Sequence, residues 1–375
     1  MYKVYKARNI LNIHKHCDGG WFWDKYSAFP YIGCEYGCEY CYERDEKYNP
    51  HRTSRDKEVL KFDDPFSEYI KIKENAPELL RSELKNRTRD LIYLDNYQPA
   101  EAKYQYVRKM LEVCLELGFP VFINEKSPML LRDLEILREI SHNSYLNIGW
   151  SIITTQDDKT LRVFEPRAPT VSVRFQAMAE LSKNGIMTGT VFMPILPFIY
   201  DTEKNIKAVV KETKECGGQY VLDGGLTLSG YCRTHFYRVL KNYDPSLIPK
   251  YDDLHNNSER LSEHTARIHG EVVKYCQRYN LSPHIPRPMN FYPKELQTNK
   301  RIAEQFYLKA RELQLSGEGG YKGWAYRKAA WALDDIKENV ANIYCKEGVR
   351  GLMKIKSVGR SLATQIEEYL RSFEE

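Results

Sequence analysis

Short apolar runs alternate with amphipathic segments from residue 91 to residue 222. Compact runs rich in β-branched and aromatic residues are typical of buried strands, and they occupy 91–94, 121–123, 146–150, 188–192 and 219–222. Apolar residues at helical spacing predict helices between these strands, at 101–117, 130–141, 171–184 and 202–216. Three of the helices are followed by Gly118, Gly185 or Gly217, where a left-handed glycine commonly closes the last turn.

This alternation of strand and helix predicts an α/β fold with a parallel sheet. When the strand that leads into a cysteine-rich loop at residues 33–42 is included, the pattern gives about six βα units. Six units build a partial (β/α)6 barrel instead of a complete eightfold one. Because the active site of a βα barrel lies at the carboxyl ends of its strands, the residues that follow these strands are the first candidates for chemistry.

The pattern changes in the C-terminal half of the chain. Residues 231–297 keep helical stretches without strands between them, and prolines interrupt the chain shortly before residue 297. Two further amphipathic helices follow at 299–313 and 324–337. We therefore predict a catalytic domain over 1–297, with a core at about 28–230 and a helical extension at 231–297, and a small all-α domain over 298–375.

The composition is that of an ordinary globular protein, with 29% charged and 42% hydrophobic residues. The formal net charge of +5 permits an anionic partner without requiring one. The sequence has no apolar run long enough for a membrane span, and no apolar stretch follows its first residues as in a secretory signal. We expect a cytoplasmic protein.

Three closely spaced cysteines, Cys34, Cys38 and Cys41, form the pattern C-x3-C-x2-C, with Tyr40 before the last cysteine. Iron–sulfur clusters are usually held by four cysteines. Three thiolates would leave one iron of a [4Fe-4S] cluster open to a substrate or cofactor. The chain has nine cysteines, an odd number without a disulfide framework, so free thiols and metal ligands are expected in a reducing compartment.

A structural zinc site is the alternative for these cysteines. Structural zinc takes four protein ligands, and His16, Cys17 and His51 are candidates for the fourth. None of the three has zinc-finger spacing. The tyrosines at positions 36, 40 and 42 also suit a nucleoside pocket better than a solvent-exposed zinc knuckle.

The cysteine motif resembles that of the radical S-adenosylmethionine (SAM) enzymes. The resemblance implies that the open iron binds SAM, and that reductive cleavage of SAM releases a 5′-deoxyadenosyl radical, which removes a hydrogen atom from the substrate. Over residues 28–230 the chain resembles the spore photoproduct lyase branch of this family. The segments that carry this resemblance beyond the cysteines are 95–101 (Asp-Asn-Tyr-Gln-Pro-Ala-Glu), 125–127 (Glu-Lys-Ser) and 165–169 (Glu-Pro-Arg-Ala-Pro).

The resemblance implies that several residues bind SAM. They are Tyr40 at the adenine, Lys126 and Ser151 at the amino-acid end, Asp95 and Glu101 at the amine or ribose, and Arg167 at a carboxylate or a DNA phosphate. Ordinary roles stay open for some of them. Tyr40 can pack in the core, Lys126 can lie on the surface, and Glu101 can cap a helix. Arg167 can pair with Glu165.

The hydrogen donor of the family is missing from its expected place. The resemblance implies a cysteine at the end of the strand before Asp95, where it returns a hydrogen atom to the repaired thymine. Residues 90–95 contain no cysteine, and Tyr93 lies near that position. Cys232, Tyr93 or Tyr97 can take the role in this chain. Cys232 can equally be an inert buried thiol.

Residues 352–366 resemble a helix-hairpin-helix motif, and residues 299–370 resemble the 8-kDa N-terminal domain of X-family DNA polymerases. A tight turn at a helix N-terminus binds phosphate through backbone N–H groups without reading sequence. The candidate DNA-binding residues are Lys354, Lys356, Ser357, Val358, Gly359 and Arg360. Ser357 replaces the usual first glycine of the turn, and Gln365 replaces the lysine that forms a Schiff base in lyase-active members. The resemblance therefore implies DNA binding without that lyase chemistry; a helical bundle for protein contacts is the alternative.

These patterns lead to three hypotheses. The first is a radical SAM DNA repair lyase that splits a thymine dimer of the spore photoproduct type in duplex DNA. It would use a [4Fe-4S] cluster, SAM and an electron donor such as flavodoxin or ferredoxin. The second is a radical SAM enzyme that acts on another nucleic acid or on a protein, which the missing donor cysteine keeps open. The third is a non-enzymatic, metal-containing DNA-binding protein.

Overall fold

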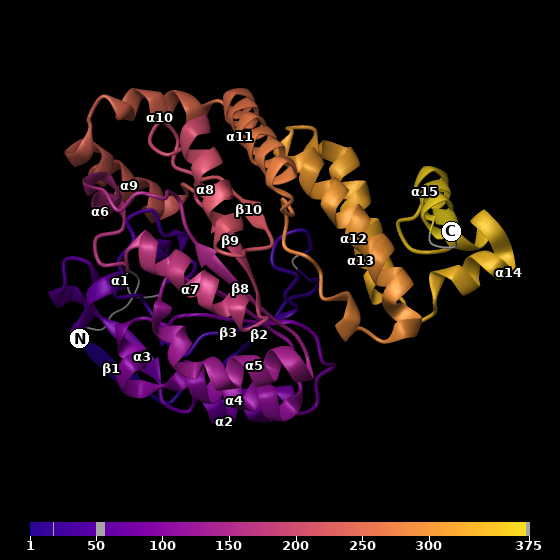
Figure 1. The fold of residues 1–375 in the computed structure, drawn as a ribbon, viewed down its shortest axis with the longest axis horizontal. Helices are drawn as coiled ribbons and strands as arrows, with labels where there is room; N and C mark the ends of the chain where they lie inside the picture. Colours follow the sequence, from indigo (N-terminus) through magenta and orange to yellow (C-terminus); the bar gives the residue numbers. More distant parts are fainter. Residues whose placement is uncertain (18, 50–56, 373–375) are drawn as a thin grey trace.

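A computed structural model describes residues 1–17, 19–49 and 57–372. Within these residues, the central sheet has seven strands in the order β10-β9-β8-β7-β6-β3-β2 (Figure 1). The strands are β2 (Leu11–Ile13), β3 (Tyr26–Ala28), β6 (Ile92–Leu94), β7 (Val121–Glu125), β8 (Leu146–Ser151), β9 (Met187–Phe192) and β10 (Val221–Asp223). The pairs from β3 to β10 are parallel, and β2 pairs antiparallel with β3. The predicted α/β class and parallel sheet are confirmed.

Helices connect the successive parallel strands, as the sequence pattern predicts. They include α2 (Ala76–Leu84), α3 (Pro99–Tyr104), α4 (Tyr106–Leu117), α5 (Leu134–Asn143), α7 (Val171–Lys183) and α8 (Glu203–Glu215). Gly118, Gly185 and Gly217 have φ of 69°, 72° and 77°, which confirms their place after helix ends. The helix predicted at 101–117 is in fact two helices, because Gln105 between them is left-handed, with φ of 55°. The helix predicted at 130–141 begins at Leu134, after a 3₁₀ turn at Pro128–Asp133.

Smaller elements surround the central sheet. A three-stranded sheet in the order β1-β5-β4 comprises β1 (Tyr2–Tyr5), β4 (Tyr31–Ile32) and β5 (Ile70–Lys73). The short helices are α1 (Pro65–Glu68) and α6 (Lys159–Phe164). The stretch predicted as a helical extension contains α9 (Gly230–Tyr243), α10 (Leu247–Asn256) and α11 (Ser258–Tyr279). Among the helices of the described residues, none combines the length and the apolar character needed to cross a membrane.

The C-terminal part consists of helices and lies on the right of Figure 1. Its elements are α12 (Lys294–Leu315), α13 (Trp324–Asp335), α14 (Val340–Leu352) and α15 (Arg360–Ser372). The predicted boundary at 297/298 falls inside α12. Trp23 and Phe122 from the sheet region share a buried cluster with Phe306 and Ala330 from the helices. The two parts are therefore joined by a common core, and their division into separate domains stays a prediction.

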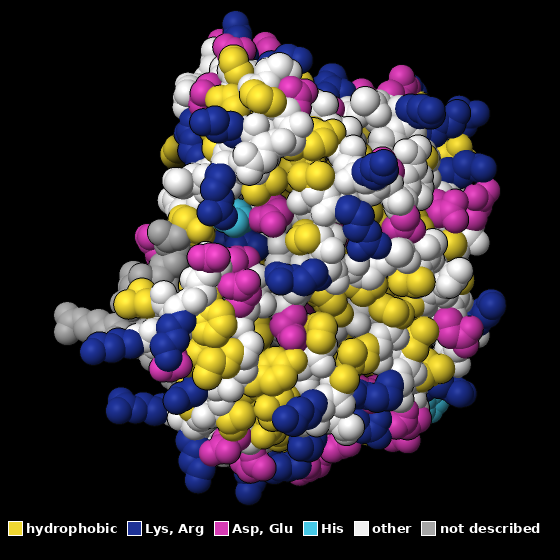
Figure 2. Space-filling model, turned by 90° about the vertical axis from the view of Figure 1, so that its left-hand side faces the viewer, with side chains coloured by type: hydrophobic (Ala, Val, Ile, Leu, Met, Phe, Trp, Pro, Cys, Tyr) yellow, Lys and Arg dark blue, Asp and Glu magenta, His cyan; other side chains and the backbone are white. Residues whose placement is uncertain are grey.

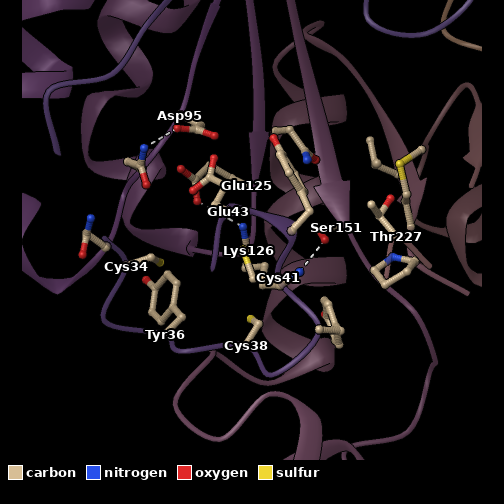
Figure 3. Close-up of a pocket in the computed structure, with 18 of the residues that line it drawn as sticks. Cys34, Tyr36, Cys38, Cys41, Glu43, Asp95, Glu125, Lys126, Ser151 and Thr227 are labelled. Carbon is tan, nitrogen blue, oxygen red and sulfur yellow. Dashed lines mark hydrogen bonds between the residues drawn. The ribbon is translucent and has the colours of Figure 1, made fainter. Parts of the chain in front are cut away.

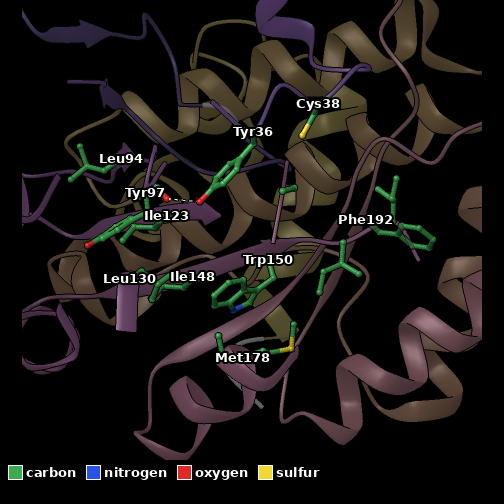
Figure 4. Close-up of a cluster of buried hydrophobic side chains, with 14 of the residues drawn as sticks. Tyr36, Cys38, Leu94, Tyr97, Ile123, Leu130, Ile148, Trp150, Met178 and Phe192 are labelled. Atoms are coloured by element: carbon green, nitrogen blue, oxygen red, sulfur yellow. Dashed lines mark hydrogen bonds between the residues drawn. The ribbon is translucent and has the colours of Figure 1, made fainter. Parts of the chain in front are cut away.

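The main apolar core anchors the cysteine loop. Tyr36 and Cys38 belong to the same buried cluster as Trp150 and Phe192 (Figure 4). The Tyr36 hydroxyl also donates to the main-chain carbonyl of Tyr97 at 2.9 Å. Because core side chains are close-packed, these contacts fix the position of the loop relative to the strand ends.

Candidate functional site

A cavity of about 380 Å³ lies at the carboxyl ends of the parallel strands (Figure 3). Its wall includes residues singled out from the sequence: Cys34, Cys38, Tyr40, Cys41, Tyr93, Asp95, Lys126 and Ser151. Asp95 follows β6, Lys126 follows β7 and Ser151 ends β8. These side chains meet because neighbouring parallel strands end at the same edge of a sheet. The structure thus brings the cysteine motif and three strand-end residues into one site.

Two glycines and a glutamine shape the cysteine loop. Gly33 and Gly37 have φ of 86° and 60°, a region that residues with a Cβ rarely adopt. A Cβ at Gly33 would also lie 2.6 Å from a main-chain carbonyl oxygen. Gln98 donates to the Gly33 carbonyl and accepts from the Glu35 N–H, both at 3.0 Å. It therefore bridges the backbone on either side of the first cysteine.

The three cysteines fit the donor set of an iron–sulfur cluster. Cys34, Cys38 and Cys41 are free thiols that line one cavity. Burial raises the pKa of each thiol, so a thiolate here needs a positive partner, which a metal centre supplies. Three such ligands would hold a cluster and leave one metal position for a further ligand.

The candidate fourth ligands of a zinc site lie elsewhere. Cys17 donates to Asp334 at 3.1 Å, and His16 stacks on Trp331 with ring centres 4.1 Å apart. His51 lies outside the described residues. Within the part of the chain that the structure describes, no three His, Cys, Asp or Glu side chains are close enough together to hold one metal ion, and this includes the three cysteines of the loop. A structural zinc site therefore has no complete set of four ligands among the described residues. An iron–sulfur cluster does not need such convergence, because each of its cysteines binds a different iron.

Lys126 brings a positive charge to the cavity wall. Its ammonium group donates to the Ser151 hydroxyl and lies 3.7 Å from a carboxylate oxygen of Glu165. The same group is 5.6 Å from the centre of the Tyr40 ring. Its side chain is 12% exposed, so Lys126 is not a surface lysine. An ammonium group held in this way can bind an anionic group of a ligand such as a carboxylate.

Glu165 and Arg174 support this wall from behind. Arg174 donates to the Glu165 carboxylate and, at 2.9 Å, to the Ser151 carbonyl. The Tyr40 hydroxyl donates to the other Glu165 oxygen. Burial by itself would raise the pKa of Glu165, but Arg174 and Lys126 lower it to about 2. The carboxylate stays ionised and holds Tyr40 and Lys126 in place.

Carboxyl groups of Glu43, Asp95 and Glu125 face the cavity on another side (Figure 3). Burial raises the pKa of Glu125, and it raises that of Glu43 to about 7. Burial, with the nearby charges of Glu43 and Glu125, raises the pKa of Asp95 well above its usual range. Asn124 adds a buried amide oxygen without a hydrogen-bond partner among the described residues. These oxygens can accept hydrogen bonds from an ammonium group or from ribose hydroxyls.

Sequence reasoning misses Glu43 and Asn124. The sequence position of each residue nevertheless indicates that it is a candidate for the site. Asn124 is a polar residue near the carboxyl end of the apolar strand β7, and Glu43 stands two residues after Cys41. Polar residues at strand ends and next to metal ligands are natural candidates for a site.

Tyr97 and Cys232 do not line this cavity. Tyr97 is completely buried, and its hydroxyl donates to Asp133 at 2.9 Å. The Cys232 sulfur lies 3.5 Å and 3.3 Å from the carbonyl oxygens of Cys41 and Tyr42, and its side chain is buried. It therefore packs against the outside of the cysteine loop. Of the three candidate hydrogen donors, Tyr93 is the one that the structure places in the cavity wall.

Arg167 and Glu101 also lie outside the cavity wall. Arg167 is exposed, and its guanidinium lies close to Gly37 on the cysteine loop. Glu165 contacts Arg174 instead of Arg167. Glu101 is completely buried and accepts from the Tyr31 hydroxyl. It also accepts from two main-chain N–H groups of the first turn of α4, at 3.0 Å and 3.1 Å, so it caps α4.

Replacing Glu101 by alanine is expected to lower the free energy of unfolding by about 2 kcal/mol, because two helix N–H groups and one tyrosine hydroxyl lose their acceptor. Binding of SAM, the ligand that the sequence analysis predicts, should not change, since Glu101 does not line the cavity. Urea denaturation and equilibrium dialysis of the cluster-loaded protein measure the two quantities. Weaker SAM binding at unchanged stability would instead place Glu101 in the cofactor site.

The predicted DNA-binding residues surround the turn between α14 and α15. They are Lys354, Lys356, Ser357, Val358, Gly359 and Arg360. Ser357 is left-handed, with φ of 63°, so it adopts the conformation that glycine usually supplies. Lys356 and Arg360 are exposed, whereas the Val358 side chain is buried among the helices. The order helix, tight turn, helix agrees with the motif, and DNA binding by it stays a prediction.

Comparisons with other sequences find relatives without an assigned function. No family model matches the chain. An uncharacterized protein of Mycobacterium tuberculosis is 24% identical over 273 residues, which cover 70% of this chain and 77% of that protein. An uncharacterized protein of Methanocaldococcus jannaschii is 27% identical over 193 residues, which cover 51% of this chain and 66% of that protein.

Comparison with solved structures identifies the fold. A spore photoproduct lyase double mutant with bound AdoMet and dinucleoside spore photoproduct has a TM-score of 0.50 and 14% identity, over 74% of this chain and 79% of that chain. A single mutant of the lyase with dinucleoside spore photoproduct has a TM-score of 0.50 and 13% identity over the same shares, 74% and 79%. The chain therefore has the fold of spore photoproduct lyase over about three quarters of its length.

Proposed function

We propose that this chain is a radical SAM DNA repair enzyme that splits a UV-induced thymine dimer of the spore photoproduct type. The observation that carries the proposal is the cavity in which Cys34, Cys38 and Cys41 meet Lys126 and Ser151 at the strand ends. The fold shared with spore photoproduct lyase supports it. That lyase structure holds AdoMet and dinucleoside spore photoproduct, and we infer ligands of the same two kinds here.

In this proposal each wall of the cavity has one task. The three cysteines would hold a [4Fe-4S] cluster, which together with SAM supplies one-electron reduction and hydrogen-atom abstraction when bound. Lys126 supplies a fixed positive charge for the carboxylate of SAM. Asp95 and Asn124 offer acceptors for its ammonium group or ribose hydroxyls, and the Tyr40 ring offers an apolar face to the adenine.

Tyr93 is the hydrogen-transfer residue in this proposal. Conversion of 5-thyminyl-5,6-dihydrothymine to two thymines breaks one carbon–carbon bond and moves one hydrogen atom, with no net oxidation or reduction. A group at the cavity must therefore return a hydrogen atom to the thymine. Tyr93 lines the cavity and its hydroxyl donates to Asp95 at 2.8 Å, so the phenol has a fixed orientation. After giving its hydrogen atom to the thymine, the Tyr93 phenoxyl radical would take one back from 5′-deoxyadenosine, so that the residue is unchanged over the whole cycle.

Replacing Tyr93 by phenylalanine is expected to reduce dimer cleavage at least about tenfold, the effect of about 1.4 kcal/mol on the barrier. SAM cleavage should continue, because the ring still fills its place and the cysteines are untouched. The ratio of 5′-deoxyadenosine to repaired thymine, measured by chromatography, separates the two steps. A Cys232→Ala protein is the comparison: if it loses thymine formation and the Tyr93→Phe protein does not, the donor is Cys232.

The proposed DNA partner rests on the C-terminal turn. Exposed Lys356 and Arg360 flank the left-handed Ser357 at the start of α15, and a helix N-terminus with basic side chains favours a phosphate. We propose that this turn holds the duplex by its backbone while the lesion leaves the stack, which costs less for a damaged base. A flavodoxin or ferredoxin is the proposed electron donor.

One experiment tests cluster, cofactor and substrate together. The protein is purified anaerobically, reconstituted with iron and sulfide, and incubated with SAM, a reductant and DNA that carries spore photoproduct. The proposal expects a brown protein, 5′-deoxyadenosine and repaired thymine. A colourless protein that contains zinc would overturn the radical SAM assignment.

A radical SAM enzyme with another nucleic-acid or protein substrate is the second candidate function. One observation favours it: β6 contains Tyr93 and no cysteine, and Cys232 does not line the cavity. SAM cleavage without turnover of spore photoproduct DNA would support this second candidate.

A further inference from the structure

A second, larger hollow opens beside the cavity that Cys34, Lys126 and Ser151 line, which we name the cofactor cavity. It has a volume of about 980 Å³. Five residues line both spaces and so form their common border: Phe22, Tyr42, Glu43, Tyr93 and Asn96. The two spaces therefore adjoin, and Tyr93 stands in the wall between them. We name the larger space the entry cleft; besides the shared residues its lining includes Tyr48, Arg327 and Trp331.

The entry cleft has aromatic side chains on the part of its wall that follows the cysteine loop. Tyr42 and Tyr48 are 46% and 50% exposed and meet edge to face, with ring centres 5.2 Å apart. The Lys47 ammonium lies 5.1 Å from the Tyr48 ring. Single exposed apolar side chains are ordinary, but two exposed rings in contact form a small contiguous apolar patch, which is the kind of surface that marks binding sites.

The helix α13 supplies another part of the same wall. Arg327 and Trp331 line the cleft, and the Trp331 ring is stacked against His16, at an angle of 7° between the ring planes. Trp324 is 55% exposed and lies with its ring centre 6.2 Å from that of Trp331. Residues 324, 327 and 331 share one face of a helix. An aromatic and basic stripe therefore runs along α13 from solvent into the cleft.

The charged side chains that line the entry cleft carry a small positive excess, with Lys15, Lys47, Lys73 and Arg327 against Asp24, Glu43 and Glu46. Between Gly319 and Arg360 the chain has nine Lys and Arg against four Asp and Glu, a formal net charge of +5. This equals the formal net charge of the whole chain, so the remaining residues are balanced. On the face shown in Figure 2, basic and acidic side chains are mixed. The excess positive charge of the chain thus lies in the segment that contains the stripe, and Arg327 is the basic residue of that segment that lines the cleft.

We propose that the entry cleft binds an unstacked strand of nucleic acid, with bases stacked on the His16–Trp331 pair and on the pair Tyr42 and Tyr48, and with Arg327 at a phosphate. Aromatic platforms and basic side chains together are the usual way in which proteins hold single strands. The inference deepens the proposed function: the strand delivers its target nucleotide past Tyr93 to the cofactor cavity. DNA and RNA share this chemistry, and the test distinguishes them.

The test uses the full chain and fluorescein-labelled strands of about twelve nucleotides, long enough for a cleft of this kind. Oligothymidylate, oligouridylate and a DNA duplex of equal length are compared by fluorescence anisotropy. Single strands should bind more tightly than the duplex. The Trp331→Ala variant should bind single strands about tenfold more weakly, the usual loss of one stacking contact. The Arg327→Ala variant should also bind them more weakly and with a smaller salt dependence, because it loses one phosphate contact. The relative affinities of the two single strands show which nucleic acid is preferred.

Matched variants control for charge and for folding. Lys328→Ala removes one charge from the same helix at an exposed position that does not line the cleft, and it should bind as the wild type does. Trp331→Phe keeps a flat ring and should restore most of the affinity. Equal binding of duplex and single strand, or unchanged binding in the Arg327→Ala and Trp331→Ala variants, overturns the inference.

The same proteins separate this inference from the proposed function. SAM cleavage by the cluster-loaded wild type without nucleic acid reports on the cysteine site alone. If SAM is cleaved and the cleft variants bind strands normally, the inference fails and the radical SAM assignment stands. If strands bind as expected and SAM is not cleaved, the proposed function fails and the entry cleft stands.

Discussion

Alanine at Cys34 is expected to abolish reductive SAM cleavage. Two thiols would remain at the cavity, too few to hold a cluster that has one position open for SAM. The loss should exceed about 100-fold, because removal of even a supporting group around a metal costs 10- to 100-fold. Iron content, the absorbance of the reconstituted protein and the yield of 5′-deoxyadenosine measure the outcome. DNA binding should persist, since the predicted DNA-binding turn is part of the C-terminal helices.

Cys345→Ala is the matched control for this substitution. Cys345 is an exposed thiol on α14, so its loss should change neither iron content nor SAM cleavage. A Cys34→Ala protein that still binds about four irons and cleaves SAM would contradict the assignment of the cluster ligands. Loss of activity in both variants would point to general damage by thiol substitution instead.

The pattern of apolar residues predicts the strands of the sheet because it reflects how deeply each strand is buried. The run at 121–123 is apolar on both faces, and the structure buries β7 under helices. Helix continuity was harder to predict. Nothing in the periodicity of 101–117 marks Gln105 as left-handed, because the break depends on Glu101 capping the helix that begins after it. A tertiary contact that changes the backbone angle of one residue does not alter the spacing of apolar residues in the sequence.

Site residues can be predicted from the sequence where they stand at the carboxyl ends of parallel strands, because those ends lie at the same edge of the sheet. Lys126 and Ser151 directly follow or end parallel strands, so their side chains had to meet at one edge of the sheet. Cys232 could not be placed in this way, since it lies in the first turn of α9 and its direction depends on how that helix packs on the cysteine loop. Trp331 reaches the entry cleft because α13 packs beside residues near the N-terminus such as His16. A local sequence pattern contains no information about this packing.

The Arg174→Met variant is expected to lose about 3–5 kcal/mol of unfolding free energy at pH 7, because it leaves the buried Glu165 carboxylate without its main partner. Both side chains are almost completely buried in the wild type. The double variant Arg174→Met with Glu165→Gln removes the stranded charge and should recover part of the loss. Urea denaturation of the protein without cofactors measures these differences. Arg81→Met, which breaks an exposed pair with Glu116, should change stability little.

The pH dependence of this loss gives the decisive test of the buried pair. The pKa of Glu165 falls from its ordinary 4.5 to about 2 in the folded protein, so its ionised form stabilises the fold above pH 4.5, and this contribution disappears as the pH falls toward 2. The Arg174→Met variant lacks most of that contribution. The difference in unfolding free energy between wild type and variant should therefore narrow as the pH is lowered from 6 to 3. A difference that stays constant over this range would mean that lost packing, and not the charge of Glu165, causes the destabilisation.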